Sequence, residues 1–521
     1  MSLLDFLRPR RRAAVPRLHP PLREATWDGS TFTLAFERND LSAVALDLDG
    51  TYFADAPIDA DGRAQFALAF SPSGQAAIAA MPRARRDGDP LAAEPLCLRF
   101  GQAGFAREPI ASELLPLVDG AQLVPFGVDA AAAHVVVVVP VYDAPELVER
   151  CLDSVLAHTT GRARLIVVDD ASPDPRIAPL LARYAGLAGV EVLRNASNRG
   201  FTASANRGID AAGGADVVLL NADTEVGPNW LTGLRRAAYS RDDVGTATAV
   251  SDNAGAFSVP ELEQANALPS GWSVEQAARA LWLQAGLAYP QLPTGNGFCL
   301  YLRRTAIDQV GKLDEAAFPQ GYGEENDFCQ RAAQAGLRHL IAGNVLVRHA
   351  RSASFGEERR RVLGEAGMAV LRRRWPDYEA EVGRTLFSFE RRALDWRVRR
   401  AYAGKPPLPR LLWVGAGAPT LREAAVWNLR ANGDRNELVA GDRVVAANTW
   451  RADDAESSYR ALWNWLQLYA FEGLLIAARK ESAAEILCRL LDIPILEIGA
   501  AHDTTLADAF ARVRSFESPS A

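Results

Sequence analysis

The chain has 521 residues, which is too many for one ordinary hydrophobic core, so we expect two to four domains. Apolar residues make up 49% of the sequence and charged residues 23%, close to the averages of globular proteins, and these values exclude a wholly disordered or fibrous chain. The formal net charge of −7 argues against a nucleic-acid-binding protein, because phosphate contacts need a surplus of basic residues.

The cysteines and the hydropathy pattern predict a reduced, cytoplasmic protein without a membrane span. The cysteines lie far apart and form no CxxC pair, which fits neither a disulfide framework nor a zinc site. No stretch approaches the roughly 18 uninterrupted apolar residues that a spanning helix needs. A second hypothesis is peripheral contact with anionic lipid at the inner face of the membrane, through the N-terminal arginines at 8 and 10–12.

Residues 31–100 show apolar side chains at every second position, the pattern of half-buried strands. The alternating segments are 32–36, 44–48, 66–70 and 96–100. Asp49-Gly50 and Asp61-Gly62 lie between them, and an Asp-Gly pair favours a hairpin turn because glycine tolerates a positive φ. We therefore predict an N-terminal, antiparallel β-rich accessory domain within residues 1–128.

One short segment of this region has an alternative interpretation. Residues 44–51, VALDLDGT, resemble the nucleophile motif of haloacid-dehalogenase-like phosphatases, with Asp47 as the nucleophile and Asp49 as the acid/base. That fold needs a helix after the motif, whereas a second strand pattern follows here at once. The hairpin interpretation is therefore favoured.

From residue 132 the pattern changes to alternating strands and helices. The run 135–139 is wholly apolar and ends at Pro140, as expected for a strand buried on both faces. Helical spacing follows over 147–156, and Asp143 with Glu146 predicts a capping box for that helix. Further strands are predicted at 165–168, 190–193 and 217–220, with helices at 180–184 and 203–212. This order predicts an α/β domain, with a mostly parallel sheet flanked by helices, over residues 132–390.

A proline-rich segment at 404–410, GKPPLPR, predicts a linker, because clustered prolines continue neither a helix nor a central strand. Apolar runs at 411–414, 474–477 and 493–498 predict strands of a small C-terminal α/β domain over 405–521. The sequence GAGAP at 415–419 has only part of a dinucleotide-binding fingerprint, and a simple turn is the favoured interpretation.

Polar residues follow each predicted strand of the central domain. The segments are PVYD at 140–143, DDAS at 169–172, NRGF at 198–201 and NAD at 221–223. Each alone is equally well explained as a helix cap or a turn. Ligands of open parallel sheets bind at the carboxyl ends of the strands, so together these segments predict a binding site.

Taken in order with GYGEENDFCQRAAQAG at 321–336, these motifs resemble the family 2 glycosyltransferases of the GT-A fold, especially the rhamnosyltransferase-like members. The resemblance spans about residues 132–355. It implies an inverting transferase that moves a sugar from a UDP- or dTDP-linked donor to a hydroxyl of a saccharide or lipid-linked saccharide. Cell-surface polysaccharide synthesis is the process that it implies.

The resemblance also implies which residues bind the donor and a divalent cation, Mn²⁺ or Mg²⁺. Asp223 closes the family's DxD-type motif, in which Asn221 replaces the first aspartate, and His349 follows a later strand at the position of a further metal ligand. The loop at 294–297, TGNG, lies near the donor sugar and the acceptor in similar enzymes. The expected nucleotide-binding residues are Pro140, Tyr142, Asp170, Asn198, Arg199 and Asn221.

The catalytic base implied by the resemblance is Glu325, with Glu324 and Asp327 placed to hold the acceptor, the sugar or neighbouring residues. The family pattern is Glu-Asp-x-Asp, so Glu325 replaces an aspartate. Acidic residues also favour the first turn of a helix, whose dipole we expect to keep these carboxylates ionised.

Two other functions compete with this one. A catalytically degenerate carbohydrate- or nucleotide-binding module in a glycan assembly complex would explain the departures at Asn221 and Glu325. A sugar-nucleotide pyrophosphorylase is disfavoured, because no basic glycine-rich phosphate loop follows the first strand. The arginine clusters at 359–361, 372–374 and 391–400 are interpreted as solvated helix faces or as a surface for a lipid-linked pyrophosphate.

Overall fold

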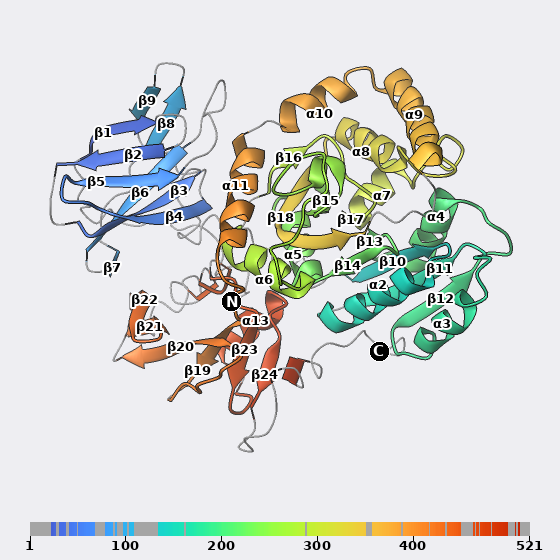
Figure 1. The fold of residues 1–521 in the computed structure, drawn as a ribbon. Helices are drawn as coiled ribbons and strands as arrows, with labels where there is room; N and C mark the ends of the chain where they lie inside the picture. Colours follow the sequence, from blue (N-terminus) through green and yellow to red (C-terminus); the bar gives the residue numbers. More distant parts are fainter. Residues whose placement is uncertain are drawn as a thin grey trace.

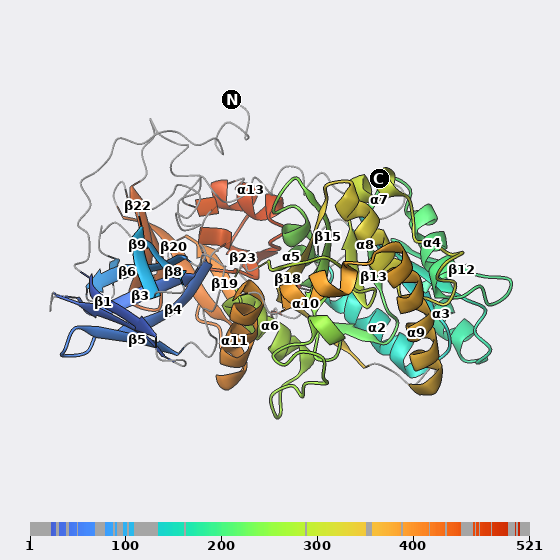
Figure 2. The ribbon, with the colours of Figure 1, turned by 90° about the horizontal axis from the view of Figure 1, so that it is seen from above.

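The computed structural model contains four sheets and their flanking helices (Figures 1 and 2). It describes residues 22–27, 31–37, 41–48, 51–67, 79–86, 89–90, 97–101, 104–108, 134–160, 163–286, 289–350, 357–386, 389–415, 417–432, 435–449, 462–463, 465–467, 469–480, 482–498, 506 and 509–510. Within these residues no helix is both long enough and apolar enough to cross a membrane.

The N-terminal strands form two antiparallel sheets, as predicted. One sheet has the order β1-β2-β5, and the other has the order β4-β3-β6-β8-β9 with β7 beside β6. The strands are β1 Leu22–Trp27, β2 Thr31–Phe36, β3 Ala43–Leu48, β4 Thr51–Pro57, β5 Arg63–Ala67, β6 Ala79–Arg86, β7 Asp89–Pro90, β8 Cys97–Gly101 and β9 Gly104–Glu108. In both views these strands lie at one side of the molecule (Figures 1 and 2).

The turn before β5 has the expected positive φ at glycine, but it is not the predicted hairpin turn, because β4 and β5 belong to different sheets. Gly62 has φ of 76°, and a Cβ atom there would lie 2.7 Å from the carbonyl oxygen of Phe36. The Asp59 carboxylate accepts hydrogen bonds from the backbone N–H groups of Asp61 and Arg63 at 3.0 and 2.8 Å. The other predicted turn residues, 49–50, lie outside the described residues.

The phosphatase interpretation of residues 44–51 is wrong. Strand β4 follows β3 directly and pairs with it in an antiparallel register, from Leu48 opposite Thr51 to Ala43 opposite Pro57. A helix is therefore absent from the position that the phosphatase fold requires within this described hairpin.

The central sheet has the order β12-β11-β10-β13-β17-β15-β18-β14, with β16 beside β18. Strands β10 to β13 pair in parallel, as do β15 and β18, whereas β17 runs antiparallel between β13 and β15. The strands are β10 Val135–Val141, β11 Ala163–Asp169, β12 Val190–Arg194, β13 Asp216–Leu220, β14 Thr224–Val226, β15 Val244–Val250, β16 Gln291–Leu292, β17 Cys299–Leu302 and β18 Arg338–His349.

Helices cover both faces of this sheet, so the apolar run of β10 is buried on both sides. Val135, Val137 and Val139 join one hydrophobic core, and Val136 and Val138 join the other. The helices are α2 Pro145–His158, α3 Ile177–Tyr184, α4 Phe201–Ala212, α5 Trp230–Ala238, α6 Val274–Gln284, α7 Arg304–Val310 and α8 Glu324–Gln334. The predicted fold class, a mostly parallel sheet flanked by helices, is confirmed.

The predicted capping box of α2 is wrong. The helix begins after Ala144, without a side-chain cap, and Pro145 takes the first helical position, where its missing N–H costs no hydrogen bond. The Asp143 carboxylate instead accepts the backbone N–H of Asp174 at 3.0 Å, and the Glu146 carboxylate accepts from Arg176 Nη1 at 2.5 Å. These contacts tie the loops after β10 and β11 together.

Three helices follow β18: α9 Glu357–Arg374, α10 Tyr378–Leu386 and α11 Phe389–Ala403. Residues 404–409 then form the predicted connection to a C-terminal sheet of order β22-β21-β20-β19-β23-β24. Its elements are β19 Arg410–Val414, β20 Ala425–Asn432, β21 Arg435–Ala440, β22 Arg443–Thr449, β23 Gly473–Ile476, α13 Ala483–Leu490 and β24 Ile495–Glu497. The division into three domains stays a prediction.

The C-terminal sheet packs on the central unit through buried charges. Arg279 on α6 contacts the Glu472 carboxylate with Nε at 3.0 Å, and Arg235 on α5 pairs with Asp492 at 2.5 Å. Trp282 donates its indole N–H to the carbonyl of Ala470 at 3.1 Å.

Candidate active site

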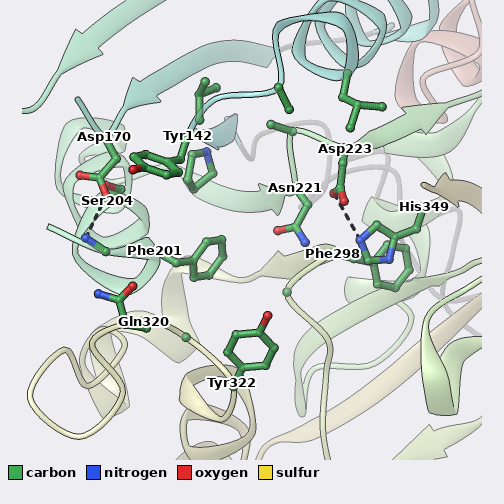
Figure 3. A pocket seen from close by; sticks show the side chains of 18 of the residues that line it. Tyr142, Asp170, Phe201, Ser204, Asn221, Asp223, Phe298, Gln320, Tyr322 and His349 are labelled. Carbon is green, nitrogen blue, oxygen red and sulfur yellow. Dashed lines mark hydrogen bonds and ion pairs between the residues drawn. The ribbon is translucent and has the colours of Figure 1, made fainter. Parts of the chain in front are cut away.

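A cavity of about 370 Å³ opens at the carboxyl ends of the parallel strands, a volume within the usual range for small-molecule sites. Its walls come from the segments after β10, β11, β12 and β13, from the loops before β17 and α8, and from the end of β18 (Figure 3). The predicted residues that line it are Pro140, Tyr142, Asp170, Asn198, Asn221, Asp223, Glu324, Glu325 and His349.

Asp170 fixes the loop that leads into α4. Its Oδ1 accepts hydrogen bonds from Asn195 Nδ2 at 2.6 Å and from the backbone N–H of Arg199 at 2.8 Å, and its Oδ2 accepts from the backbone N–H of Gly200 at 2.8 Å. A carboxylate has about four lone-pair sites, so these contacts leave one acceptor position. Because Asp170 lines the cavity, that position is available to one donor group of a ligand.

The side chain of Arg199 lies outside the cavity. Its guanidinium lies 3.6 Å from the Glu315 carboxylate, its side chain is about half exposed, and it is absent from the described cavity lining. The expectation that this side chain surrounds the nucleotide therefore needs correction. Only its backbone N–H serves the site, through Asp170.

Gly200 allows α4 to approach the wall of the cavity. Its φ is 87°, and a Cβ atom there would lie 2.2 Å from the carbonyl oxygen of Pro319. The hydroxyl of Thr202 donates to the carbonyl of Phe318, and Asn206 Nδ2 donates to that of Leu313 at 2.9 Å. The start of α4 thereby holds the loop that carries Gln320 and Tyr322 into the cavity (Figure 3).

Asp223 and His349 lie together because β14 and β18 pair in an antiparallel register. Thr224 is opposite His349 in that ladder. The imidazole Nε2 lies 3.3 Å from Asp223 Oδ1. A dashed line marks this contact in Figure 3. The ring stacks on Phe298, with centroids 5.4 Å apart and an interplanar angle of 19°.

The other ring nitrogen of His349 fixes its orientation. Nδ1 lies 3.0 Å from the carbonyl oxygen of Asn253, to which it can only donate, and the backbone N–H of His349 donates to Asp252 Oδ1 at 2.9 Å. In the neutral ring Nε2 then presents a lone pair toward Asp223. This carbonyl–imidazole arrangement is the usual support of a metal-binding histidine.

The Asp223–His349 pair fits a divalent cation bound partly by its ligand. Among the residues that the structure describes, no group of three or more His, Cys, Asp or Glu side chains could hold a metal ion by itself. Mg²⁺ commonly takes one or two protein ligands together with substrate phosphates and water. Asn221, whose side chain points into the same cavity, adds an amide oxygen or nitrogen beside them (Figure 3).

Glu324 and Glu325 begin α8, and both line the cavity. Burial and the adjacent carboxylate of Glu325 raise the pKa of Glu324 well above its ordinary value. Burial also raises the pKa of Glu325. Desolvation therefore opposes the helix dipole, which was expected to keep these carboxylates ionised.

Asp327 faces away from the cavity. It is fully buried, its Oδ2 lies 2.9 Å from Arg331 Nε, and its Oδ1 accepts from Arg374 Nη1 and Trp375 Nε1 at 3.0 and 3.1 Å. Of the alternatives expected for Asp327, these contacts agree with holding neighbouring residues, because all the partners belong to α8 or to the end of α9 and its following residue. Asp327 anchors α9 behind the acidic helix.

Several cavity residues had no role assigned from the sequence: Phe201, Ser204, Ala254, Gly255, Gln320 and Tyr322. Phe201 and Tyr322 nevertheless belong to predicted segments, 198–201 and 321–336. No sequence motif pointed to the turn that contains Ala254 and Gly255. Of the predicted loop 294–297, only Asn296 and Gly297 line the cavity.

Residues 136–311 match the sequence model of the family described as Glycosyl transferase family 2. This segment is a family 2 glycosyl transferase domain. The segment contains Asp170, Asn221 and Asp223, whereas Glu324, Glu325 and His349 lie beyond the matched residues of this glycosyl transferase domain.

Two curated relatives give further context. The chain is 26% identical over 244 residues to the N-acetylglucosaminyl-diphospho-decaprenol L-rhamnosyltransferase of Mycobacterium tuberculosis, a match that covers 43% of this chain and 78% of the relative. It is 31% identical over 108 residues to the Escherichia coli protein named uncharacterized glycosyltransferase YibD, covering 20% of this chain and 30% of that protein.

Solved structures also match, at low similarity. The mannosyltransferase PcManGT from Pyrobaculum calidifontis, in complex with GDP-Man and Mn²⁺, aligns with a TM-score of 0.36 and 18% identity, over 52% of this chain and 74% of that one. GalNAc-T7 with UDP, GalNAc and Mn²⁺ aligns with a TM-score of 0.33 and 18% identity, over 42% of this chain and 44% of that one.

Proposed function

We propose that this chain is a metal-dependent, inverting glycosyltransferase that moves a sugar from a UDP- or dTDP-linked donor to a hydroxyl of a saccharide or lipid-linked saccharide. The observation that carries the proposal is one cavity that brings together Asp170, the Asp223–His349 pair and the Glu324–Glu325 pair. These groups supply a nucleotide contact, a cation site and a buried acid–base pair.

The nucleotide end of the cavity is proposed to lie at Pro140, Tyr142, Asp170 and Asn198. The remaining acceptor position of Asp170 suits a ring N–H of uracil or thymine or a ribose hydroxyl. Tyr142 lies beside Asp170 and presents an aromatic ring to the same space (Figure 3). Arg199 is left out of this set, since its side chain turns toward Glu315.

Asp223 and His349 are the proposed ligands of Mn²⁺ or Mg²⁺, with Asn221 beside them. Bound there, the cation would stabilise the negative charge of the departing nucleoside diphosphate. Two neighbouring residues orient His349 for this role: the Asn253 carbonyl sets the tautomer of the imidazole, and Phe298 stacks against the ring.

Glu325 is the proposed base that takes the proton from the acceptor hydroxyl as it attacks the anomeric carbon. Its Oε2 is buried and makes no hydrogen bond within the described structure. A raised pKa makes Glu325 a better proton acceptor near neutral pH than an ordinary carboxylate. Protonated Glu324 keeps the second negative charge away from Glu325.

The biological setting is proposed by similarity. The mycobacterial relative is named for a diphospho-decaprenol acceptor, which supports a lipid-linked saccharide as acceptor here. We accordingly propose a role in cell-surface polysaccharide synthesis, at a cytoplasmic location with peripheral contact at the inner face of the membrane. The N- and C-terminal units would then be accessory domains.

The metal site can be tested by substitution. Asp223→Ala should lower Mn²⁺-dependent release of UDP or dTDP from candidate donors by more than about 100-fold, because it removes a cation ligand. Glu225→Ala is a matched control two residues away, since Glu225 is absent from the lining of the large cavity. Intact metal-dependent turnover in Asp223→Ala would refute the metal assignment. Donor binding without turnover in the wild type would favour the degenerate binding module.

A further inference from the structure

The turn at residues 251–258 forms part of the cavity wall and orients His349. Ala254 and Gly255 line the cavity. The carbonyl of Asn253 accepts from His349 Nδ1, and the carboxylate of Asp252 accepts from the His349 backbone N–H. A shift of this turn would therefore rotate the imidazole relative to Asp223.

Hydrogen bonds at and next to Ser258 close the turn. The hydroxyl of Ser258 accepts from the backbone N–H of Ala254 at 2.8 Å. The backbone N–H groups of Ser251 and Val259 donate to the carbonyls of Phe257 and Ser251 at 3.0 and 2.9 Å. A contact that fixes Ser258 thus fixes the whole turn.

Arg391 on α11 makes that contact with Ser258. Its side chain is fully buried, and its Nη2 donates to the carbonyl oxygen of Ser258 at 2.6 Å. Its Nη1 pairs with the carboxylate of Asp395, one helical turn later, which is itself buried. A planar guanidinium held in this way has little freedom, so it transmits the position of α11 to the turn.

We infer that Arg391 is a positioning residue for the metal-binding half of the site: it acts through Ser258 and the 251–258 turn to aim His349 at Asp223. The inference rests on the proposed function, because it assumes that Asp223 and His349 bind a cation. Arg391 lies 80 residues beyond the part of the chain that matches the transferase family. It donates hydrogen bonds to Ser258 and Asp395, and neither of these residues lines the cavity.

The test uses the full chain with Arg391→Met and the double variant Arg391→Met/Asp395→Leu. The double variant removes both buried charges, which avoids leaving an unpaired carboxylate in the interior and preserves folding. Arg397→Met is the matched control. Arg397 is also buried on α11 and donates to a backbone carbonyl, that of Ala285 at the end of α6, at 2.7 Å.

Two readouts are measured: amide hydrogen exchange of residues 251–259, and Mn²⁺ affinity by electron paramagnetic resonance with UDP present. Both Arg391 variants should exchange faster in this turn and bind Mn²⁺ about 10-fold more weakly, the usual effect of losing support for a metal ligand. Binding of UDP without metal should stay within about twofold of wild type, since Asp170 is untouched. Arg397→Met should leave the turn and the Mn²⁺ affinity unchanged.

The inference would be overturned if both Arg391 variants kept the wild-type rate of amide hydrogen exchange in the turn and the wild-type Mn²⁺ affinity. It would also be overturned if Arg397→Met changed both quantities as much as the Arg391 variants do. Asp223→Ala separates this failure from failure of the proposed function. Loss of Mn²⁺ binding in Asp223→Ala but not in the Arg391 variants refutes only the positioning role. Wild-type Mn²⁺ binding in Asp223→Ala refutes the metal site, and the exchange rates then still decide whether Arg391 holds the turn.

Discussion

At the scale of single residues, the adjacent carboxyls of Glu324 and Glu325 determine the chemistry that this cavity can perform. Two buried carboxylates so close together cannot both ionise at low cost. Glu324 is the more buried of the two, with 3% of its surface exposed, and burial together with the neighbouring carboxylate raises its pKa. Glu325, half-buried at the cavity surface, is left as the proton acceptor.

Glu324→Gln should change the pH dependence of stability. A carboxyl whose pKa is raised by folding binds a proton that the unfolded chain releases, so its contribution is fully present at low pH. That contribution declines as pH rises from the ordinary carboxyl range through the raised pKa of the folded state. We expect the stability of Glu324→Gln relative to wild type to increase with pH, as measured by unfolding midpoints between pH 5 and pH 9. Parallel profiles for the two proteins would contradict the shared-proton arrangement.

At the scale of elements, the sequence patterns predicted the strands and helices of the central sheet but not their long-range contacts. The valine run of β10 and the polar residues at the strand ends were sufficient to predict the layers and most of the cavity. The approach of Asp223 to His349 depends on the short β14–β18 ladder, which joins segments more than 120 residues apart. No local pattern specifies that pairing.

Local sequence patterns also did not predict the directions in which side chains point. Arg199 and Asp327 stand in motifs beside cavity residues, yet their partners lie on other elements, at Glu315 and Arg374. The acidic first turn of α8 was predicted, but the burial that raises the pKa of Glu324 was not. Packing of α9 and of the 313–321 loop decides these outcomes, and that packing is tertiary.

Gly200→Ala tests the close approach at the start of α4. The positive φ and the 2.2 Å approach to the Pro319 carbonyl should force the loop apart, cost about 1–3 kcal/mol of stability and weaken nucleotide binding. Gly213→Ala is the control, because Gly213 also has a positive φ, of 65°, but no atom would lie within 4 Å of a methyl group added there. Thermal unfolding and UDP titration compare the two, and equal losses of UDP affinity would contradict this role of Gly200.

At the scale of the whole molecule, the C-terminal sheet is joined to the transferase unit by more than the linker at 404–409. Arg235 and Arg279 are buried in the contact, with partners Asp492 and Glu472 on the C-terminal side. Buried charges of this kind need their partners, so we expect the two units to unfold together.

Glu472→Gln should therefore destabilise the chain by up to roughly 3 kcal/mol, because it removes the buried carboxylate that pairs with Arg279 and leaves only the more exposed Glu275 beside the guanidinium. Glu379→Gln removes an exposed ion pair with Arg372 and should cost much less, because solvent screens exposed charges. Thermal unfolding of the two variants measures the difference. Similar melting temperatures would show that the interdomain pair contributes little.

The central claim, that this cavity transfers sugar with Glu325 as the base, is tested most directly by single-turnover transfer from a UDP- or dTDP-sugar to a lipid-diphosphate saccharide. We predict that Glu325→Gln lowers the rate of transfer by about 100-fold to 10,000-fold while donor affinity stays close to wild type. Glu365→Gln, an exposed position on α9, should leave the rate unchanged. A Glu325→Gln variant that transfers sugar at the wild-type rate would contradict the account.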